Sequence, residues 1–224
     1  MQSLRTRAIL LRRTNYGEAD RIVQLLTPTG KHSVMAKGVR REKSRLAGGI
    51  ELFAICDVVI STGKGELGIL TSARLVQFYN HIMEDYDRMQ FAYAVIKLVT
   101  KASEMVDEPE WYDVLSEVLM GLDAHSIQLE LVQAWFYVRY AALLGHELNL
   151  YHDTAGDTLV ADGQYRYDDT DQGLRLVAGG EIGVEHIKLL RLTATKPLQT
   201  LAQIGGITGI VGDCAVLARQ HAAV

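Results

Sequence analysis

Five basic residues gather within a short stretch of a chain whose formal net charge is -4. The stretch reads AKGVRREKSRLAGG, occupies residues 36–49 and contains one acid, Glu42. Its cations are Lys37, Arg40, Arg41, Lys43 and Arg45. A cluster of cations is not buried without partners, so these must face solvent, where they can bind the phosphates of a polyanion. Four more cations could extend this basic track: Arg12, Arg13, Arg21 and Lys31. A loop that is merely solvated is the alternative interpretation.

The distribution of charge favours binding of a polyanion. Residues 1–80 hold thirteen Lys and Arg against six Asp and Glu, whereas residues 81–224 hold ten against twenty-one. Such a split indicates a basic module for a polyanion and an acidic module with another role. Few aromatic residues are available for base stacking in the basic part: Tyr16, Phe53, Phe78 and Tyr79. We therefore expect recognition of the phosphate backbone with little sequence selectivity.

Acidic residues in the same region offer a weaker possibility. Glu18 and Asp20, together with Asp57, could hold the metal ion of a nuclease, although a turn or an ion pair with Arg21 is the favoured interpretation. The sequence GKGELG, residues 63–68, superficially suggests a phosphate-binding loop. It lacks the Lys-Ser/Thr that should follow, so a hairpin turn is expected instead.

Metal-binding and thiol chemistry have little support in the second half of the chain. His146, His152 and Asp153 could ligate zinc, but H-x5-H-D is not a strong zinc pattern. Cys56 and Cys214 lie far apart in sequence and predict free thiols of a reducing compartment. We expect neither a metal nor a cofactor, and a protein that is not an enzyme.

The first eighty residues have the pattern of a small β-barrel. Runs rich in branched residues, separated by turn sequences, predict strands at 6–13, 21–27, 32–39, 54–61 and 67–78. In the last strand an alternating set predicts one buried face: Leu67, Ile69, Thr71, Ala73 and Leu75. Five strands of this size favour the OB-fold, while an SH3-like barrel would show a similar pattern.

After residue 80 the spacing of apolar residues becomes helical. Amphipathic segments predict helices near 89–99, 111–122 and 131–142, and helical spacing returns near residue 187. Residues 149–180 are rich in Gly and Asp and predict an irregular hairpin. The expected fold class is therefore α+β, with a five-stranded OB-fold barrel at 1–80 followed by an α-helical domain at 81–224.

The N-terminus MQSLRTRAILLRR lacks the apolar core and the cleavage site of a signal peptide. Apolar runs are also too short to span a bilayer, so we expect a cytoplasmic protein without a membrane partner.

Several of these motifs together resemble the RecO family. The run NYGEADRIVQLLTPTGKHSVMAKGVRREKSRLAGGIELF, residues 15–53, is similar to the family's N-terminal domain, and GELGILTSARLV resembles its last barrel strand. FYVRYAALLGHEL, residues 136–148, is similar to the signature F-x-x-R-x-x-x-L-L-G. The resemblance covers residues 6–150 in order and is weak over the last seventy residues.

This resemblance implies an OB-fold followed by a helical domain in a mediator of DNA repair and homologous recombination. Such proteins bind single- and double-stranded DNA and anneal complementary strands. They contact RecR and the acidic, apolar C-terminal tail of single-stranded-DNA-binding protein, and they help load RecA onto coated strands. The basic stretch would then be a DNA-facing edge, in a protein associated with the nucleoid.

In one respect the sequence departs from the family pattern. Many members carry a four-cysteine zinc site just after the L-L-G helix, whereas no cysteine follows here until Cys214. We therefore expect a zinc-free insert at 149–180.

Arg139 is the candidate for binding the partner tail. It is the only basic residue between Lys101 and Arg166, and it lies in an apolar helix where an unpaired cation is costly. A carboxylate of the tail could pair with it. The alternative is an internal salt bridge to one of three acids: Asp113, Glu117 or Glu130.

The basic barrel also permits a different function, because the same loop could bind structured RNA through its phosphates and 2′-hydroxyls. An OB-fold RNA-binding protein is therefore the alternative to a recombination mediator.

Overall fold

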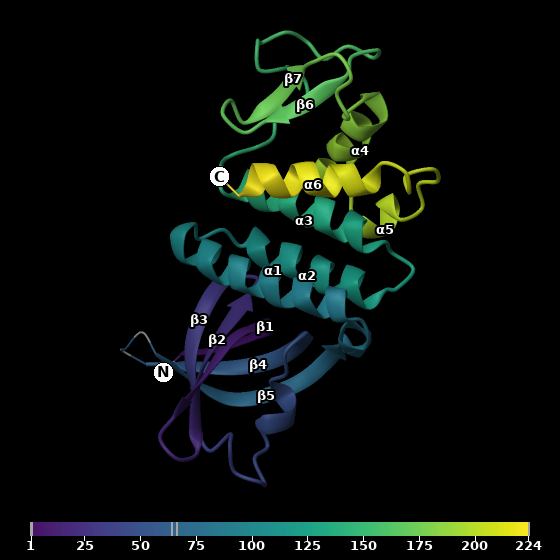
Figure 1. Cartoon of the computed structure of the whole chain (residues 1–224). Coiled ribbons are helices and arrows are strands. Elements are labelled where there is room, and N and C mark those ends of the chain that lie inside the picture. Colours follow the sequence, from purple (N-terminus) through teal and green to yellow (C-terminus); the bar gives the residue numbers. More distant parts are fainter. Residues whose placement is uncertain (1, 64, 66, 224) are drawn as a thin grey trace. The chain divides into compact units, whose positions relative to one another are not determined.

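The computed structural model describes residues 2–63, 65 and 67–223. The chain divides into two compact units, Met1–Asp123 and Ala124–Val224 (Figure 1). The first unit includes the barrel and two helices that follow it. Lys64 and Glu66, in the turn expected at 63–68, lie outside the described residues.

The barrel is formed by five strands: β1 (Gln2–Tyr16), β2 (Asp20–Thr27), β3 (Gly30–Ala36), β4 (Ala54–Thr62) and β5 (Gly68–Phe78). Their order is β1-β2-β3-β5-β4, and antiparallel pairing of β1 with β4 closes the barrel. Strands β3 and β5 run parallel. This is the five-stranded Greek-key arrangement of the OB-fold, which confirms the expected fold class and decides between the two barrel types.

Alternate residues of the strands fill the barrel, as in Leu10, Val23 and Val34. The prediction of which residues of β5 face the core is partly wrong. Leu70 and Ala73 contact the core, whereas Thr71 is exposed. A register shift opposite Val59 and Ile60 interrupts the alternation, so a strict two-residue period does not hold along this strand.

Two helices of the first unit pack on the barrel. They are α1 (Tyr86–Met105) and α2 (Glu110–Asp123), preceded by the 3-10 helix η2 (Asn80–Glu84). Ile9 and Leu26 pair across β1 and β2 and are buried outside the inner core, where α1 contacts β1 and α2 contacts β2. The outward apolar residues of these strands therefore form a second core beneath the helices.

The second unit is mainly helical, with α3 (Leu129–Leu143), α4 (Val184–Thr195), α5 (Leu198–Leu201) and α6 (Val211–Ala222). Helix α3 packs against α6 and α4, and its Trp135 and Phe136 are buried. A hairpin of β6 (Tyr165–Asp168) and β7 (Gly173–Leu176) lies within the segment where an irregular hairpin was expected. In the described part of the chain, no helix has the length and apolar character needed to cross a membrane.

Candidate nucleic-acid interface

The basic stretch is a loop between β3 and β4, because β3 ends at Ala36 rather than continuing to residue 39 as expected. Two apolar residues of the loop anchor it. Val39 is buried in the barrel core, and Leu46 packs against that core. The side chains of Lys37, Arg40, Arg41, Lys43 and Arg45 are exposed. We call residues 37–46 the basic loop.

Hydrogen bonds attach the basic loop to the turn between β1 and β2. The backbone N–H of Gly38 donates to Oδ1 of Asp20 at 2.7 Å, and the N–H of Arg40 donates to the carbonyl of Ala19 at 2.9 Å. Nη1 of Arg40 also donates to the carbonyl of Gly17 at 3.2 Å. Figure 1 shows this turn and the loop together at the lower end of the barrel, away from α1 and α2.

The backbone conformation of this region requires glycine at two positions. Gly38 has a φ of 63°, a conformation that residues with a Cβ atom rarely adopt. Gly49 lies in the 3-10 helix η1 (Ala47–Gly49), where a Cβ atom would overlap the carbonyl of Ala73 on β5. Because the residues that end the stretch are small, the chain can pack closely against the barrel there.

Of the four additional cations, two share one face of the β1–β2 pair. Arg13 lies opposite Val23, and Asn15 lies opposite Arg21, so Arg13 and Arg21 share the face that continues the barrel interior. Nε of Arg21 donates to Oδ1 of Asn15 at 3.1 Å, which orients the guanidinium.

The other two cations lie elsewhere. Arg12 is exposed opposite Gln24, on the other face of the β1–β2 pair. Lys31 is the second residue of β3 and is separated from Lys37 by the length of the strand, which rises about 3.3 Å per residue. Its Nζ lies 3.2 Å from Oε1 of Glu104 on α1. The structure therefore does not bring Lys31 to the basic loop.

Two of the three acids considered as metal ligands have other partners. Asp20 accepts the N–H of Gly38, and Oδ2 of Asp57 lies 2.6 Å from Nη2 of Arg74 on β5. Of the two roles expected for these residues, a turn forms at residues 17–19, and Nε of Arg21 contacts Asn15. Among the described residues, no group of three or more His, Cys, Asp and Glu side chains is placed to hold a metal ion.

Aromatic side chains are scarce on the barrel surface. Phe53 and Tyr79 are buried, and Phe78 packs against the core. Tyr16, at the end of β1, is 55% exposed. Of the four aromatic residues noted in the sequence, Tyr16 alone presents most of its ring to solvent.

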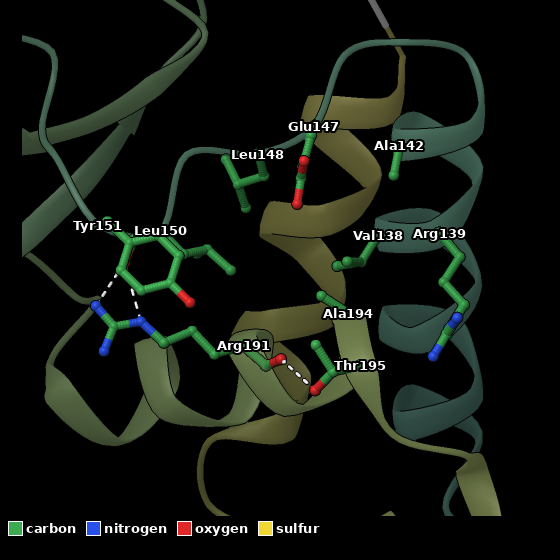
Figure 2. A pocket seen from close by; sticks show the side chains of 10 residues that line it. All are labelled: Val138, Arg139, Ala142, Glu147, Leu148, Leu150, Tyr151, Arg191, Ala194 and Thr195. Carbon is green, nitrogen blue, oxygen red and sulfur yellow. Dashed lines mark hydrogen bonds between the residues drawn. The ribbon is translucent and has the colours of Figure 1, made fainter.

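A pocket of about 100 Å³ lies in the second unit. Val138, Leu148 and Ala194 contribute apolar surface, and Arg139 and Arg191 carry charge at its sides (Figure 2). Ten residues line it in all, from α3, from the segment 147–151 and from α4.

Both arginines of this pocket are held in place. The guanidinium of Arg139 lies 4.5 Å from the centre of the Trp135 ring, and its Nη2 donates to the carbonyl of Lys196 at 3.3 Å. Arg191 donates through Nε and Nη2 to the carbonyl of Leu150. Sequence reasoning missed Arg191, although it lies beside Ile187, Leu190 and Ala194 on a helical repeat and could have been found as a cation within an apolar stripe.

The insert is held by hydrogen bonds to short side chains and by Tyr165. Oδ1 of Asp153 accepts the N–H groups of Ala155 and Asp157, so this candidate zinc ligand stabilises a turn. Tyr165 is buried and its hydroxyl accepts the N–H of Val160 at 2.8 Å. The insert thus has a packed anchor of its own.

Two histidines connect this insert to the helices. Nε2 of His221 donates to the carbonyl of His146 at 2.6 Å, because a carbonyl can only accept. Nδ1 of His221 therefore accepts the hydroxyl of Tyr167 on β6 at 2.9 Å. In this way α6 bridges the end of α3 and the hairpin.

Comparison with known proteins gives a consistent result for both parts of the chain. Residues 1–79 match the family model for the N-terminal region of recombination protein O, and residues 83–208 match that for its C-terminal region. The match extends beyond residue 150, where the sequence resemblance became weak.

Individual relatives cover the chain to different extents. A DNA repair protein RecO from a Roseiflexus species is 29% identical over 215 residues, which are 89% of this chain and 73% of that protein. DNA repair proteins RecO from Dehalococcoides mccartyi and Bifidobacterium longum are 34% and 33% identical over 65% of this chain. The matched segments are 58% and 62% of those two proteins, so the chain aligns with less than two thirds of their length.

Proposed function

Because this chain belongs to the RecO family, we propose that it acts in DNA repair and recombination as a mediator. In this proposal it binds single- and double-stranded DNA, anneals complementary strands and helps load RecA onto strands coated with single-stranded-DNA-binding protein. It acts through binding, without catalysis, close to the nucleoid. The relatives named above are all called DNA repair proteins.

The observation that carries the proposal is the basic loop fixed to the β1–β2 turn. OB-folds bind nucleic acids with strands 2 and 3 and the adjacent loops, including the one between strands 1 and 2. Here Asp20, Ala19 and Gly17 of that turn hold Gly38 and Arg40 of the basic loop. Five exposed cations are therefore presented at one end of the barrel, where each contact with a phosphate releases a counterion.

For DNA contact we propose the cations of the basic loop together with Arg13 and Arg21, which share one face of the β1–β2 pair. Arg12 is exposed on the opposite face of the β1–β2 pair and would contact DNA that passes across that face. Lys31 would contribute little to DNA binding, because it forms an ion pair with Glu104.

The proposed protein partners are RecR and the C-terminal tail of single-stranded-DNA-binding protein. An acidic tail with an apolar anchor needs an apolar pocket with a cation at its mouth. The pocket beside Arg139 and Arg191 offers apolar surface and two cations, and it is also lined by one acid, Glu147. An internal ion pair of Arg139 is the alternative role for that residue.

One assay tests the proposed function directly. Complementary DNA strands are mixed with the protein, first bare and then coated with single-stranded-DNA-binding protein, while duplex formation is followed by fluorescence. We expect faster annealing on both substrates. Parallel reactions with complementary RNA strands test the RNA-binding alternative, and a magnesium titration tests for nuclease activity. Acceleration confined to RNA would favour the RNA-binding alternative, and cleavage dependent on magnesium would favour a nuclease.

A further inference from the structure

Tyr16 has an unusual position for an aromatic residue of this barrel. Its side chain is 55% exposed, whereas Phe53 and Tyr79 are 2% and 7% exposed. Within the described part of the chain, the Tyr16 side chain makes no hydrogen bond or ring contact. Packing therefore does not explain why a large ring stands at the end of β1.

The neighbours of Tyr16 are the residues that hold the basic loop. Asp20 lies directly opposite Tyr16 in the β1–β2 pair and accepts the N–H of Gly38. The carbonyl of Gly17, the next residue in the chain, accepts a hydrogen bond from the guanidinium of Arg40. Opposite residues of an antiparallel pair have Cα atoms about 4.5–5.5 Å apart, so the ring stands beside the base of the loop.

On these grounds we propose that Tyr16 is a stacking platform for an unpaired base, beside the phosphates bound by the basic loop; this inference rests on the proposed function. A nucleotide presents a flat apolar base and a charged phosphate, which match the ring of Tyr16 and the guanidinium of Arg40. Stacking needs a base that is free of its neighbours, as in a single strand. The bases of a duplex are already stacked on one another, so only the phosphates of duplex DNA meet the loop.

Tyr16 thus gives the barrel a preference for single strands that the cations alone do not give. Phosphate contacts act on both forms of DNA, while a stacking residue adds affinity only where bases are exposed. This makes Tyr16 a specificity-determining residue for strand state rather than for base sequence, because every base has a π-face.

The test compares Tyr16→Ala and Tyr16→Phe with the parent on three labelled ligands, followed by fluorescence anisotropy. The ligands are an oligothymidine, an oligonucleotide of the same length made of abasic sites, and a blunt duplex. We expect Tyr16→Ala to weaken binding to oligothymidine by about 5- to 100-fold. Binding to the abasic strand and to the duplex should equal that of the parent, and Tyr16→Phe should retain the affinity of the parent.

A control variant and a second readout separate stacking from other effects. Tyr86→Ala removes a tyrosine of the same unit that is 69% exposed at the start of α1, and should change none of the three affinities. Tyr16→Ala should also leave the salt dependence of binding unchanged, because it removes no phosphate contact.

Two outcomes overturn the inference while leaving DNA binding in place. Tyr16→Ala could bind oligothymidine as tightly as the parent, or it could lose the same factor on all three ligands. If the parent binds none of the three ligands, the proposed function fails, and the role of Tyr16 fails with it.

Discussion

The carbonyl oxygen of Gly17 accepts a hydrogen bond from Nη1 of Arg40 at 3.2 Å, although 23 residues separate them in sequence. The contact joins the β1–β2 turn to the basic loop at a point where both are exposed. Together with the bond between Gly38 and Asp20, it fixes the start of the loop on the barrel. The cations are therefore presented from a supported backbone rather than from a free segment.

Asp20 gives the first test of this support. Replacing Asp20 with Ala removes the acceptor of the Gly38 N–H and also removes a negative charge beside the cations. Charge alone would raise DNA affinity, whereas a loosened loop lowers it. We expect single-strand affinity to fall by about 2- to 5-fold, with a loss of about 1–3 kcal/mol in the free energy of unfolding.

Asp20→Asn is the matched control, because the amide keeps an oxygen acceptor while removing the charge. It should bind DNA at least as tightly as the parent. Tighter binding by Asp20→Ala than by Asp20→Asn would show that the anchor has no role in binding.

The sequence predicted the barrel because its turns and branched runs are local signals, and the basic loop because charge cannot be buried. Faces were harder to predict. The register shift in β5 depends on pairing with β4, so Thr71 was assigned to the wrong face. The sequence also did not show which cations lie beside the basic loop, because the contact that holds Lys31 elsewhere, with Glu104, joins residues far apart in the chain.

The insert should fold without zinc. Structural zinc usually needs four nitrogen or sulfur ligands, and the residues nearest to that role are His146 and His152. The buried side chain of Tyr165 stabilises the insert instead of a metal ion. We expect well under one zinc per purified chain by elemental analysis, and an unchanged melting temperature in the presence of a chelator. A stoichiometric metal whose removal unfolds the protein would contradict this prediction.

His221 should make stability depend on pH. Burial lowers the pKa of His221 below its ordinary value of 6.5, although the His146 carbonyl opposes the shift. As the pH falls through about 6.5, the unfolded chain takes up a proton that the folded chain does not. The contribution to stability is therefore complete above that pH and is lost below it.

The measurement is urea unfolding of the parent and of His221→Gln at pH 7.5 and 5.5. The parent should lose more stability between these values, by up to about 1.4 kcal/mol for one proton over one pH unit. Because burial also lowers the pKa of His32, the difference between the two proteins is the relevant quantity. Equal losses would assign the dependence to groups other than His221.

Arg139 should contribute to binding of an acidic tail peptide. Its guanidinium already lies over Trp135 at the side of the pocket, so a carboxylate can pair with it without reordering the side chain. We expect Arg139→Ala to weaken binding of the labelled tail of single-stranded-DNA-binding protein by about 10- to 100-fold, measured by fluorescence polarisation. Arg166→Ala, an exposed arginine of β6, is the control and should bind like the parent. A folded Arg139→Ala protein with the affinity of the parent would make Arg139 structural and place the tail elsewhere.

The central claim is that the basic loop binds DNA through phosphates, and the most direct measurement is the salt dependence of single-strand affinity. Arg40→Ala with Arg41→Ala should weaken binding to strands of any sequence by similar factors, and each lost contact should flatten the slope of log K against log salt by about 0.7. Lys97→Ala with Lys101→Ala makes the same charge change at exposed positions on α1 and should leave the slope near that of the parent. Unchanged affinity of the Arg40 and Arg41 variant across the salt range, or a loss confined to one sequence, would contradict the claim.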